Sequence, residues 1–268
     1  MPSIAVDYVL FDLDGTLVSS TDAAEQAWLK LCEKYNVDYN TLSQVSHGSR
    51  TEEILAKFFP DVDNTNNQAV KEFELSIAND YMDIVCLVPG SADLLISLDR
   101  PTGSLPGEVF HHRKWAVVTS GSPWVAHAWF DNLLKSIKKP EVFITAFDVA
   151  KGKPDPAGYA LATEQLKKVW NDDRKEVNTV VFEDAPVGVK AGKANGSIVV
   201  ALTSTYDKEL LFDAGADYVV EDLTQICLRS NKTNETVLII TDPLDRDGDD
   251  DEDNDDDFDD EEEDDNND

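Results

Sequence analysis

The most informative stretch of the chain is Val9-Leu10-Phe11-Asp12-Leu13-Asp14-Gly15-Thr16, in which an apolar run meets two carboxylates and a glycine. The apolar residues that lead up to Asp12, from Val6 onward, are typical of a buried parallel strand. Residues two apart on a strand point to the same face, so we expect Asp12 and Asp14 to be aimed together at the carboxyl end of this strand. Ligands of open α/β sheets bind at that end, and Gly15 lets the backbone turn sharply there.

Two carboxylates held this close repel each other, by roughly 4 kcal/mol at ~4 Å and an effective dielectric of about 20. A cation would relieve the repulsion, and ligands that are all oxygen suit Mg²⁺. Thr16 adds a hydroxyl at the turn. On these residues alone a second interpretation is equally open, in which one Asp caps the turn and the other faces water.

The charge of the chain is concentrated at its C-terminal end. Of the net charge of −31 over 268 residues, Asp245 to Asp268 contributes 18 acidic residues and one Arg, or −17, which leaves −14 for the other 244 residues. A chain of this length makes one or two domains with a sizeable core. Since no strongly basic segment occurs, we expect neither nucleic acid nor an anionic membrane as a partner.

The cysteines and the apolar runs argue against several other classes of protein. Cys32, Cys86 and Cys227 lie far apart and form neither a zinc-binding spacing nor a disulfide framework. The N-terminus lacks the positive and apolar regions of a signal peptide, and no run of about 18 apolar residues predicts a membrane span. We therefore expect a cytoplasmic protein.

Residues 19–87 have a helical pattern without strands. Asp22 and Glu25 resemble a capping box at the start of the first helix, and Pro60 ends the third. The block predicts a small helical cap domain, residues 19–87, inserted after the first strand. Apolar side chains recur at helical spacing in four segments: 22–35, 42–45, 50–59 and 70–84.

After the junction at Pro89-Gly90, strands and helices alternate along the chain. This alternation predicts an α/β fold, a doubly wound, Rossmann-like parallel sheet with right-handed crossovers. Residues 1–18 and 88–243 are expected to form this core domain, and 236–240 to add a final edge strand. The other predicted strands are 115–119, 142–145, 177–182, 197–202 and 218–220, and the predicted helices are 92–98, 123–134, 156–170, 187–194 and 208–214.

Residues 244–268 are low in hydrophobicity and dense in like charge. Such a segment cannot bury enough apolar surface to offset its ordering entropy, so we expect it to be disordered. Two roles stay open for this acidic tail: a solubilising appendage, or a docking segment for a basic protein partner.

The stretch 116–123 is an apolar strand that ends in Thr119 and Ser120. Ser122 and Pro123 follow as a good N-cap and a good first helical residue. Ordinary helix capping explains the stretch as well as a phosphate cradle does, built from the Thr119 hydroxyl, the N–H groups near Ser120 and the positive end of the helix.

Two further stretches carry charged side chains. Lys153 lies in a loop ahead of a helix, and a loop lysine is commonly a solvated charge, but Pro154 and Pro156 fix this loop. Glu183 and Asp184 end another apolar strand, and by themselves two acids in such a position often form an ordinary loop.

Taken together and in order, these stretches resemble the four motifs of the haloacid dehalogenase-type phosphatases. The first motif of that family is D-x-D-G-T/V, here Asp12 to Thr16. Thr119 matches the Ser/Thr of the second motif, Lys153 the Lys-Pro-x-Pro of the third, and Glu183-Asp184 the acids of the fourth. The resemblance covers residues 4–240, and the helical insert resembles the subgroup with an α-helical cap.

The resemblance implies a Mg²⁺-dependent phosphatase. In the family the first Asp, here Asp12, is the nucleophile that forms an aspartyl-phosphate, and the second, Asp14, is the general acid and base. Dehalogenases lack the second Asp, so its presence indicates phosphoryl transfer. Lys153 would neutralise the phosphate and the nucleophile.

The same resemblance implies the binding residues. The phosphate-binding residues would be Thr16, Thr119 and Ser120. The metal-binding residues would be Asp12, Asp14 through its backbone carbonyl, Asp184, and Glu183 either directly or through water.

Several stretches look more specifically like fungal sugar and polyol phosphatases, those of 2-deoxyglucose 6-phosphate first and of glycerol phosphate next. The implied substrate is a small phosphorylated sugar or polyol. A sugar phosphomutase is disfavoured, because the cap His of such enzymes, ten residues after the second Asp, is replaced by Ala24. A non-catalytic regulator that acts through the tail is disfavoured by the four intact motifs. The stretches are 46–50, 115–122, 152–156 and 182–188.

Substrate specificity is expected in the cap, around His47 and Arg50. Arg50 precedes a helix, where a positive charge opposes the helix dipole by about a few tenths of a kcal/mol, which indicates another role. An Arg can donate to a phosphate or to sugar hydroxyls in fixed geometry, and cap loops of the resembled family reach substrate from this position. The alternative is a surface Arg paired with Glu53 and a His that is merely a polar loop residue.

Overall fold

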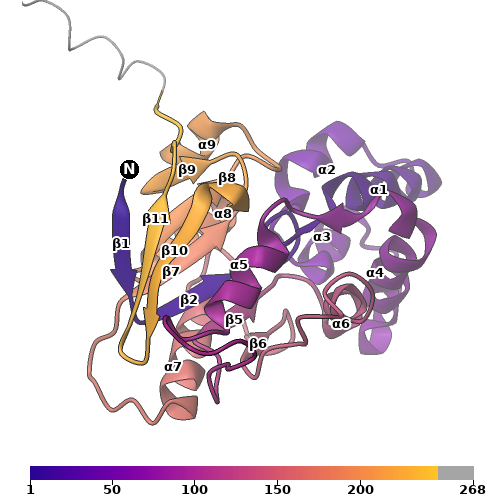
Figure 1. Cartoon of the computed structure of the whole chain (residues 1–268). Helices are drawn as coiled ribbons and strands as arrows, with labels where there is room; N and C mark the ends of the chain where they lie inside the picture. The colour runs from indigo at the N-terminus through magenta and orange to yellow at the C-terminus, as the bar shows by residue number, and fades with distance from the viewer. Residues whose placement is uncertain (247–268) are drawn as a thin grey trace, which may run out of the picture.

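The computed structural model describes residues 1–246, which form a core of sheets and packed helices with a block of helices beside it (Figure 1). None of the helices in this part of the chain combines the length and the apolar character that a bilayer span requires. The expectations for the acidic tail, disorder and a solubilising or docking role, fall largely on residues 247–268, which lie outside the described residues.

The main sheet of residues 1–246 is parallel and has six strands in the order β6-β5-β2-β7-β8-β9, which confirms the predicted α/β fold class. β2 lies between β5 and β7, and its Phe11 is in register with Phe182 of β7. The carboxyl ends of these three strands therefore meet at one edge of the sheet, where such sheets bind ligands. The strands are β2 (Tyr8–Phe11), β5 (Trp115–Val118), β6 (Phe143–Ile144), β7 (Thr179–Glu183), β8 (Ile198–Leu202) and β9 (Tyr218–Val220).

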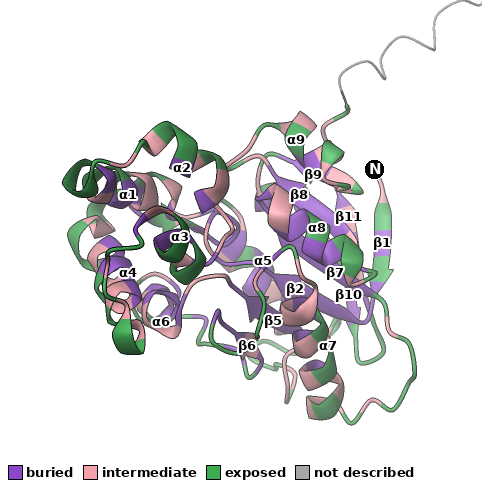
Figure 2. Cartoon of the chain, turned by 180° about the vertical axis from the view of Figure 1, so that it is seen from behind, coloured by how far each residue is buried: buried purple, intermediate pink, exposed green. Residues whose placement is uncertain are grey.

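Both faces of this sheet are buried (Figure 2). Leu10 points to the face covered by α7 (Ala157–Val169), α8 (Pro186–Ala194) and α9 (Lys208–Asp213). Phe11 points to the opposite face, covered by α5 (Ser91–Leu98), α6 (Pro123–Asn132) and a second sheet. Strands buried on both faces require continuous apolar runs, which is the pattern that the sequence has.

The second sheet is antiparallel and consists of β1 (Ser3–Val6), β11 (Glu235–Ile240) and β10 (Ile226–Lys232), with β11 in the middle. The expectation of an edge strand at 236–240 is wrong, because these residues form the central strand of a separate sheet. The expectation that Val6 belongs to the buried strand is also wrong, since Val6 lies in β1 and pairs with Thr236.

Asp7 is the reason that the first apolar run is divided into two strands. Its carboxylate accepts a hydrogen bond from the N–H of Asn178 at 2.7 Å and pairs with Arg174 at 2.7 Å. A buried carboxylate with these partners cannot sit inside a continuous apolar strand, so the chain changes sheets between Val6 and Tyr8.

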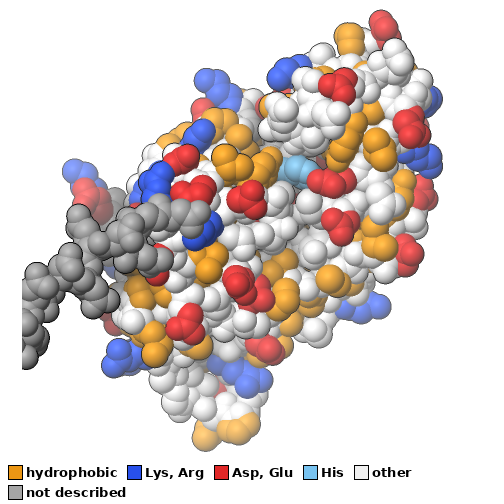
Figure 3. Space-filling view, turned by 90° about the horizontal axis from the view of Figure 1, so that it is seen from above, with side chains coloured by type: hydrophobic (Ala, Val, Ile, Leu, Met, Phe, Trp, Pro, Cys, Tyr) orange, Lys and Arg blue, Asp and Glu red, His pale blue; other side chains and the backbone are white. Residues whose placement is uncertain are grey.

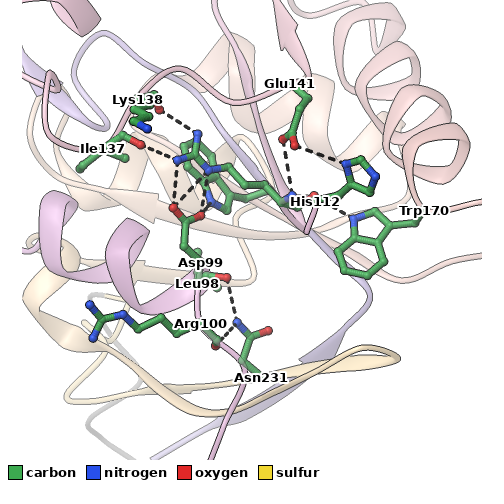
Figure 4. Close-up of polar contacts among 11 residues, drawn as sticks. Leu98, Asp99, Arg100, His112, Ile137, Lys138, Glu141, Trp170 and Asn231 are labelled. Atoms are coloured by element: carbon green, nitrogen blue, oxygen red, sulfur yellow. Dashed lines mark hydrogen bonds and ion pairs between the residues drawn. The ribbon is translucent and has the colours of Figure 1, made fainter. Parts of the chain in front are cut away.

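A polar network anchors the end of α5 to β5 and β10 (Figure 4). Asp99 accepts from Arg113 Nε and Nη2, each at 2.9 Å, and from Trp115 Nε1 at 2.8 Å. Asn231 of β10 donates to two backbone carbonyls at the end of α5, at 2.9 and 3.0 Å. The network fixes the start of β5, the strand that is followed by Thr119.

The helical block contains α1 (Thr21–Tyr35), α2 (Tyr39–Ser46), α3 (Thr51–Phe58) and α4 (Gln68–Asp80), with 3-10 turns at Thr65–Asn67 and Met82–Ile84. The two segments that join it to the core pair with each other, β3 (Val18–Ser19) with β4 (Cys86–Leu87). This paired connection supports the predicted division into a cap domain, residues 19–87, and a core domain, residues 1–18 and 88–243. The division itself stays a proposal.

The start of α1 differs from the predicted capping box. Its N-cap is Ser20, and neither Asp22 nor Glu25 caps the helix. The Ser20 hydroxyl makes no cap bond but donates to Asp14 at 2.8 Å, and the Glu25 carboxylate contacts His47 at 3.1 Å. Both side chains are used for contacts that the helical spacing does not reveal.

The chain stays packed up to Arg246, beyond the predicted start of the tail at 244. The N–H of Leu244 donates to the carbonyl of Val219 at 2.8 Å, and Arg246 pairs with Asp213 of α9. An apolar side chain and a cation with an acidic partner distinguish these residues from the acidic run that follows.

On the face shown in Figure 3, acidic side chains are spread widely, with fewer basic ones between them.

Candidate active site

The predicted catalytic groups meet at the carboxyl ends of β2, β5 and β7, next to the helical block (Figure 1). Asp12 directly follows β2, Thr119 follows β5, and Asp184 follows β7. A cavity lies between the core and the block. Its lining from the core includes Asp12, Asp14, Thr119, Ser120, Gly121 and Asp184.

Asp12 forms an ion pair with Lys153 through Oδ1, and both side chains are buried. Burial raises the pKa of Asp12 well above its usual range, and so do the nearby carboxylates of Glu183 and Asp184, while Lys153 opposes them. Burial alone would lower the pKa of Lys153, but the carboxylates of Asp12 and Glu183 hold it well above its ordinary value. The lysine therefore stays charged beside the predicted nucleophile.

The carboxylate of Asp14 is held by three neutral donors. Its Oδ1 accepts from Ser20 Oγ at 2.8 Å and from Trp129 Nε1 at 2.7 Å, and its Oδ2 accepts from Thr119 Oγ1 at 3.3 Å. Burial raises the pKa of Asp14, and these hydrogen bonds oppose the rise. A fixed carboxyl group with a raised pKa is suited to giving and taking a proton.

Three carboxylates form a group that could hold a metal ion. Ligand oxygens of Asp12, Glu183 and Asp184 lie within 4.8 Å of one another, and all three side chains are buried. Lys153 is the cation that contacts two of them, so a negative charge remains for a divalent ion to offset. Oxygen-only ligands of this kind fit Mg²⁺. The side chain of Asp14 is not part of this group, and its expected role through the backbone carbonyl stays a prediction.

Asp184 is a buried carboxylate that lies against the turn after Asp14. Its Oδ1 accepts from Thr16 Oγ1 at 3.1 Å, and burial, followed by the charge of Glu183, raises its pKa to about 7. Gly15 lies against it with φ of +87°, and a Cβ there would fall 2.1 Å from Asp184 Oδ2. Only glycine leaves this space open, so the turn after Asp14 is shaped around the carboxylate.

Glu183 has its hydrogen-bonding capacity committed within the protein. Oε1 accepts from Lys153 Nζ at 2.5 Å and Tyr159 OH at 2.9 Å, while Oε2 accepts from the N–H groups of Asp184 and Ala185 at 3.0 and 3.1 Å. The side chain is 0% exposed. This geometry favours a role in holding Lys153 and the turn that carries Asp184 over direct ligation.

The two predicted phosphate-binding hydroxyls at the end of β5 lie in the cavity lining, but Thr16 does not. Thr16 is 0% exposed and gives its hydroxyl to Asp184, which places it behind the metal-binding group. Thr119 Oγ1 accepts from Gly121 N at 2.9 Å, and Ser120 Oγ donates to the carbonyl of Gly48 in the helical block at 2.7 Å. The backbone from 119 to 121 therefore turns around the Thr119 side chain.

The helical block supplies the other walls of the cavity. His47 lines it, and its Nε2 lies 3.1 Å from Glu25 Oε1. Burial lowers the pKa of His47. The apolar lining consists of Ala24, Trp28, Phe73, Ile77 and Val125, and the polar lining from the block includes Ser46, His47, Ser49, Thr51 and Glu74.

Arg50 is not brought into this cavity. It is buried as the N-cap of α3, where its Nη2 donates to the carbonyl of Val149 at 3.1 Å and its Nε lies 3.5 Å from Glu53. A Cβ on Gly152 would fall 2.8 Å from Arg50 Nε. Arg50 therefore crosses from the helical block to the loop that carries Lys153.

Several side chains that hold the site were not identified from the sequence. Ser20 and Trp129 fix Asp14, Tyr159 fixes Glu183, and Thr205 donates to Asp184. The sequence does contain an indication of Thr205, because a run of three residues with hydroxyl groups, residues 203–205, follows the end of a predicted strand at 202. Ser20, Trp129 and Tyr159 lie within helices or at a helix start, where spacing gives no such indication.

The fold and this arrangement of side chains define a class of hydrolase. The chain belongs to the haloacid dehalogenase-like hydrolases, whose family model matches residues 6–196. This confirms the family that the four motifs predict.

Among curated proteins, the chain is 52% identical over 248 residues to the 2-deoxyglucose-6-phosphate phosphatase 2 of Saccharomyces cerevisiae, with 92% of this chain and 100% of that one covered. It is 37% identical over 246 residues to the glycerol-1-phosphate phosphohydrolase 2 of the same yeast, with 90% and 93% covered. Among solved structures, a hydrolase from Pseudomonas syringae matches with a TM-score of 0.63 and 24% identity, over 81% of this chain and 94% of that one. The structural match supports the fold.

Proposed function

We propose that this protein is a Mg²⁺-dependent phosphomonoesterase that hydrolyses small sugar phosphates of the 2-deoxyglucose 6-phosphate type. The observation that carries the proposal is that Asp12, Asp14 and Asp184 line one cavity and that Asp12 is paired with the buried Lys153. A relative of 52% identity that is named for this substrate supports the substrate class.

In the first step an oxygen of Asp12 attacks phosphorus, and the bond from phosphorus to the sugar oxygen breaks. Lys153 holds Oδ1 of Asp12, which leaves Oδ2 for the attack. Asp14 gives its proton to the departing alkoxide. The products of this step are the free sugar and an aspartyl-phosphate on Asp12.

In the second step Asp14 takes a proton from water, and the water oxygen attacks the same phosphorus. The bond from phosphorus to Asp12 breaks, which frees the carboxylate and inorganic phosphate. The hydroxyl of Thr119 and the backbone N–H of Ser120, both residues of the cavity lining, are suited to hold the phosphoryl oxygens. Mg²⁺, held by Asp12, Asp184 and the backbone carbonyl of Asp14, would offset the negative charge that phosphate brings to a carboxylate.

The lining of the cavity fits a small sugar as the leaving group. Trp28, Phe73 and Ile77 offer an apolar wall, while His47 and Ser49 offer hydrogen-bonding groups. A sugar ring presents both kinds of surface. Ala24 also lines the cavity, and because its methyl group cannot transfer a proton, a phosphomutase reaction receives no support there.

A glycerol-phosphate phosphatase is the second candidate, supported by the relative of 37% identity. The two candidates differ in the preferred leaving group, which the relative kcat/KM values for 2-deoxyglucose 6-phosphate and glycerol 1-phosphate would separate. A tenfold preference corresponds to about 1.4 kcal/mol of transition-state binding.

The test is phosphate release by the purified full-length chain, with p-nitrophenyl phosphate, 2-deoxyglucose 6-phosphate, glucose 6-phosphate and glycerol 1-phosphate as substrates. We expect Mg²⁺-dependent turnover that EDTA abolishes, with 2-deoxyglucose 6-phosphate preferred over glycerol 1-phosphate. The Asp12→Asn variant is the matched control for contaminating phosphatases. Absence of Mg²⁺-dependent release from every substrate would refute the proposal.

A chain shortened to residues 1–246 separates the enzyme from a non-catalytic regulator that acts through the acidic tail. This limit retains Leu244 and Arg246, which pack on the core. The enzyme proposal predicts unchanged turnover in the shortened chain. The tail stays a candidate docking segment for a basic protein partner, which co-purification with the full chain and not with 1–246 would support.

A further inference from the structure

Glu74 is a carboxylate buried inside the helical block. It lies on α4, is 2% exposed, and lines the cavity of the candidate active site. Buried carboxylates normally pair with a cation, because removing a charge from water is costly. In the described part of the chain the hydrogen-bond partners of Glu74 are neutral donors, which calls for an explanation.

These donors come from two different parts of the molecule. Oε1 accepts from the hydroxyl of Thr51 on α3, at 2.7 Å. Oε2 accepts from both the N–H of Ser122, at 3.0 Å, and the Ser122 hydroxyl. Thr51 belongs to the helical block, whereas Ser122 belongs to the core, so Glu74 joins the two.

Ser122 is the N-cap of α6, and its Oγ also accepts from the N–H of Trp124 at 3.3 Å. The first N–H groups of a helix lack partners within the helix, and the helix dipole favours an anion beside them. The carboxylate of Glu74 satisfies one of these groups from across the boundary between block and core. Its position is thus set by the start of a core helix.

The same turn of the core carries the phosphate-binding groups. Thr119 Oγ1 accepts from Gly121 N and contacts Asp14, and Ser120 Oγ donates to the carbonyl of Gly48 in the helical block. The segment 119–122 is therefore held by the block at two points, through Gly48 and through Glu74. Between these points lies Gly121, whose backbone lines the cavity.

We propose that Glu74 is a positioning residue that couples closure of the helical block to the placement of segment 119–122. This inference rests on the proposed phosphatase function. With the block closed, the carboxylate fixes Ser122 and, through the backbone, the N–H of Gly121 and the side chain of Thr119. With the block open, Ser122 loses its acceptor, so the segment is free to move.

This role predicts a specific kinetic pattern. In Glu74→Gln the amide N–H₂ can face Thr51, whose hydroxyl can also accept, but the neutral amide oxygen is a weaker acceptor than a carboxylate for the two donors of Ser122, so the link weakens. Loss of an interaction that aligns the reacting groups lowers kcat, whereas loss of uniform substrate binding raises KM. A positioning role therefore predicts a lower kcat with KM nearly unchanged.

The experiment compares Glu74→Gln, Ser122→Ala and the double variant with the wild type, using the best sugar phosphate and p-nitrophenyl phosphate. We expect Glu74→Gln to lower kcat at least about tenfold for the sugar phosphate with KM changed less than about threefold. The double variant should be no worse than the more impaired single variant, because both remove one link. Glu72→Gln is the matched control, since Glu72 is exposed on the same helix.

Three outcomes would overturn the proposal: wild-type kinetics of Glu74→Gln, a rise in KM with kcat retained, or additive losses in the double variant. The second of these would make Glu74 a substrate-binding residue. If Glu74→Gln does not fold by circular dichroism, Ser122→Ala carries the test, with a loss of kcat expected. A wild type without phosphatase activity would refute the proposed function, whereas an active wild type with an equally active Glu74→Gln would refute only the coupling.

Discussion

The hydroxyl of Ser20 donates to Oδ1 of Asp14 at 2.8 Å, although Ser20 is the N-cap of α1 and the helix lacks a side-chain cap bond. Ser20 directly follows β3, one of the two strands that connect the helical block to the core. The proposed acid and base is thus tied to the connection about which the block would move. A capping serine contributes about 1 kcal/mol to helix stability, and here its hydroxyl serves Asp14 instead.

Ser20→Ala should therefore lower turnover. A hydrogen bond to a charged group is worth about 1.5–3 kcal/mol, so we expect kcat to fall by about tenfold or more. The melting temperature should fall only as far as the loss of this one bond explains, because no cap bond is lost with it. Steady-state kinetics and thermal unfolding check both parts, with the exposed Ser19→Ala as a neighbouring control. Equal activity of the two variants would contradict the assignment.

Asp12→Asn and Asp14→Asn should fail at different steps. An amide at position 12 cannot attack phosphorus well, so Asp12→Asn should show no turnover and no covalent phosphate. Asp14→Asn should nearly abolish turnover, and with p-nitrophenyl phosphate, whose leaving group departs without a proton, it should accumulate the aspartyl-phosphate, because the second step lacks its base. Mass spectrometry after rapid acid quench distinguishes them. Near-normal turnover of Asp12→Asn would remove it as the nucleophile.

Asp184→Ala and Glu183→Gln should separate metal binding from positioning. Asp184 lines the cavity and is held by the hydroxyls of Thr16 and Thr205, whereas the oxygens of Glu183 are committed to Lys153, Tyr159 and backbone N–H groups. Asp184→Ala should raise the Mg²⁺ concentration for half-maximal rate at least about tenfold. Glu183→Gln should instead lower kcat and thermal stability with a smaller change in Mg²⁺ dependence. The reverse pattern would make Glu183 the ligand.

Arg50→Ala should impair sugar phosphates and p-nitrophenyl phosphate alike. Its guanidinium binds the carbonyl of Val149 and packs on Gly152, so its loss weakens contact between the block and the Lys153 loop rather than contact with a sugar. Gly152→Ala should mimic it, because a Cβ would displace Arg50. His47→Ala, by contrast, should change the ranking among sugar and polyol phosphates, since His47 lines the cavity. A sugar-specific rise in KM in Arg50→Ala would restore the specificity role expected from the sequence.

Glu74 should make stability fall with rising pH. Burial, opposed by the hydrogen bonds of Ser122 and Thr51 and reinforced by the charge of Asp14, raises its pKa from 4.5 to about 7. Between these values the folded chain binds more protons than the unfolded chain, so the free energy of unfolding decreases as pH rises, by about 3 kcal/mol in total. Glu74→Gln should lack this contribution, whereas the other buried carboxylates with raised pKa values keep theirs. Parallel stability curves of the two proteins between pH 4.5 and 7 would contradict it.

The sheet core could be predicted because its signals are local. β2, which ends at Phe11 just before Asp12, β5, which ends at Val118 just before Thr119, and β7, which ends at Glu183, are largely apolar runs buried on both faces. β10 could not be predicted from its own residues. They include Cys227, Arg229 and Asn231, a mixture that is typical of a loop, and only the pairing with β11 makes this segment a strand.

The support of the site could not be predicted, because it depends on contacts between segments far apart in the chain. Nothing in the spacing of α4 indicates that Glu74 meets Ser122, and nothing around Trp129 indicates that its Nε1 reaches Asp14. Arg50 illustrates the same point. Its place at the helix start was predicted correctly, but the direction of its side chain depends on a loop about a hundred residues later, at Val149.

Because β1 pairs with β11, the first described strand of the chain gains its partner only when the last described strand has been made. Ser3 lies opposite Ile239, and the N–H of Ile240 donates to the carbonyl of Pro2. The strands that carry Asp12, Thr119 and Asp184 are all synthesised before that partner exists. During synthesis the chain therefore passes through a stage in which every catalytic group is present while β1 remains an unpaired edge, open to other nascent chains until Glu235–Ile240 emerges.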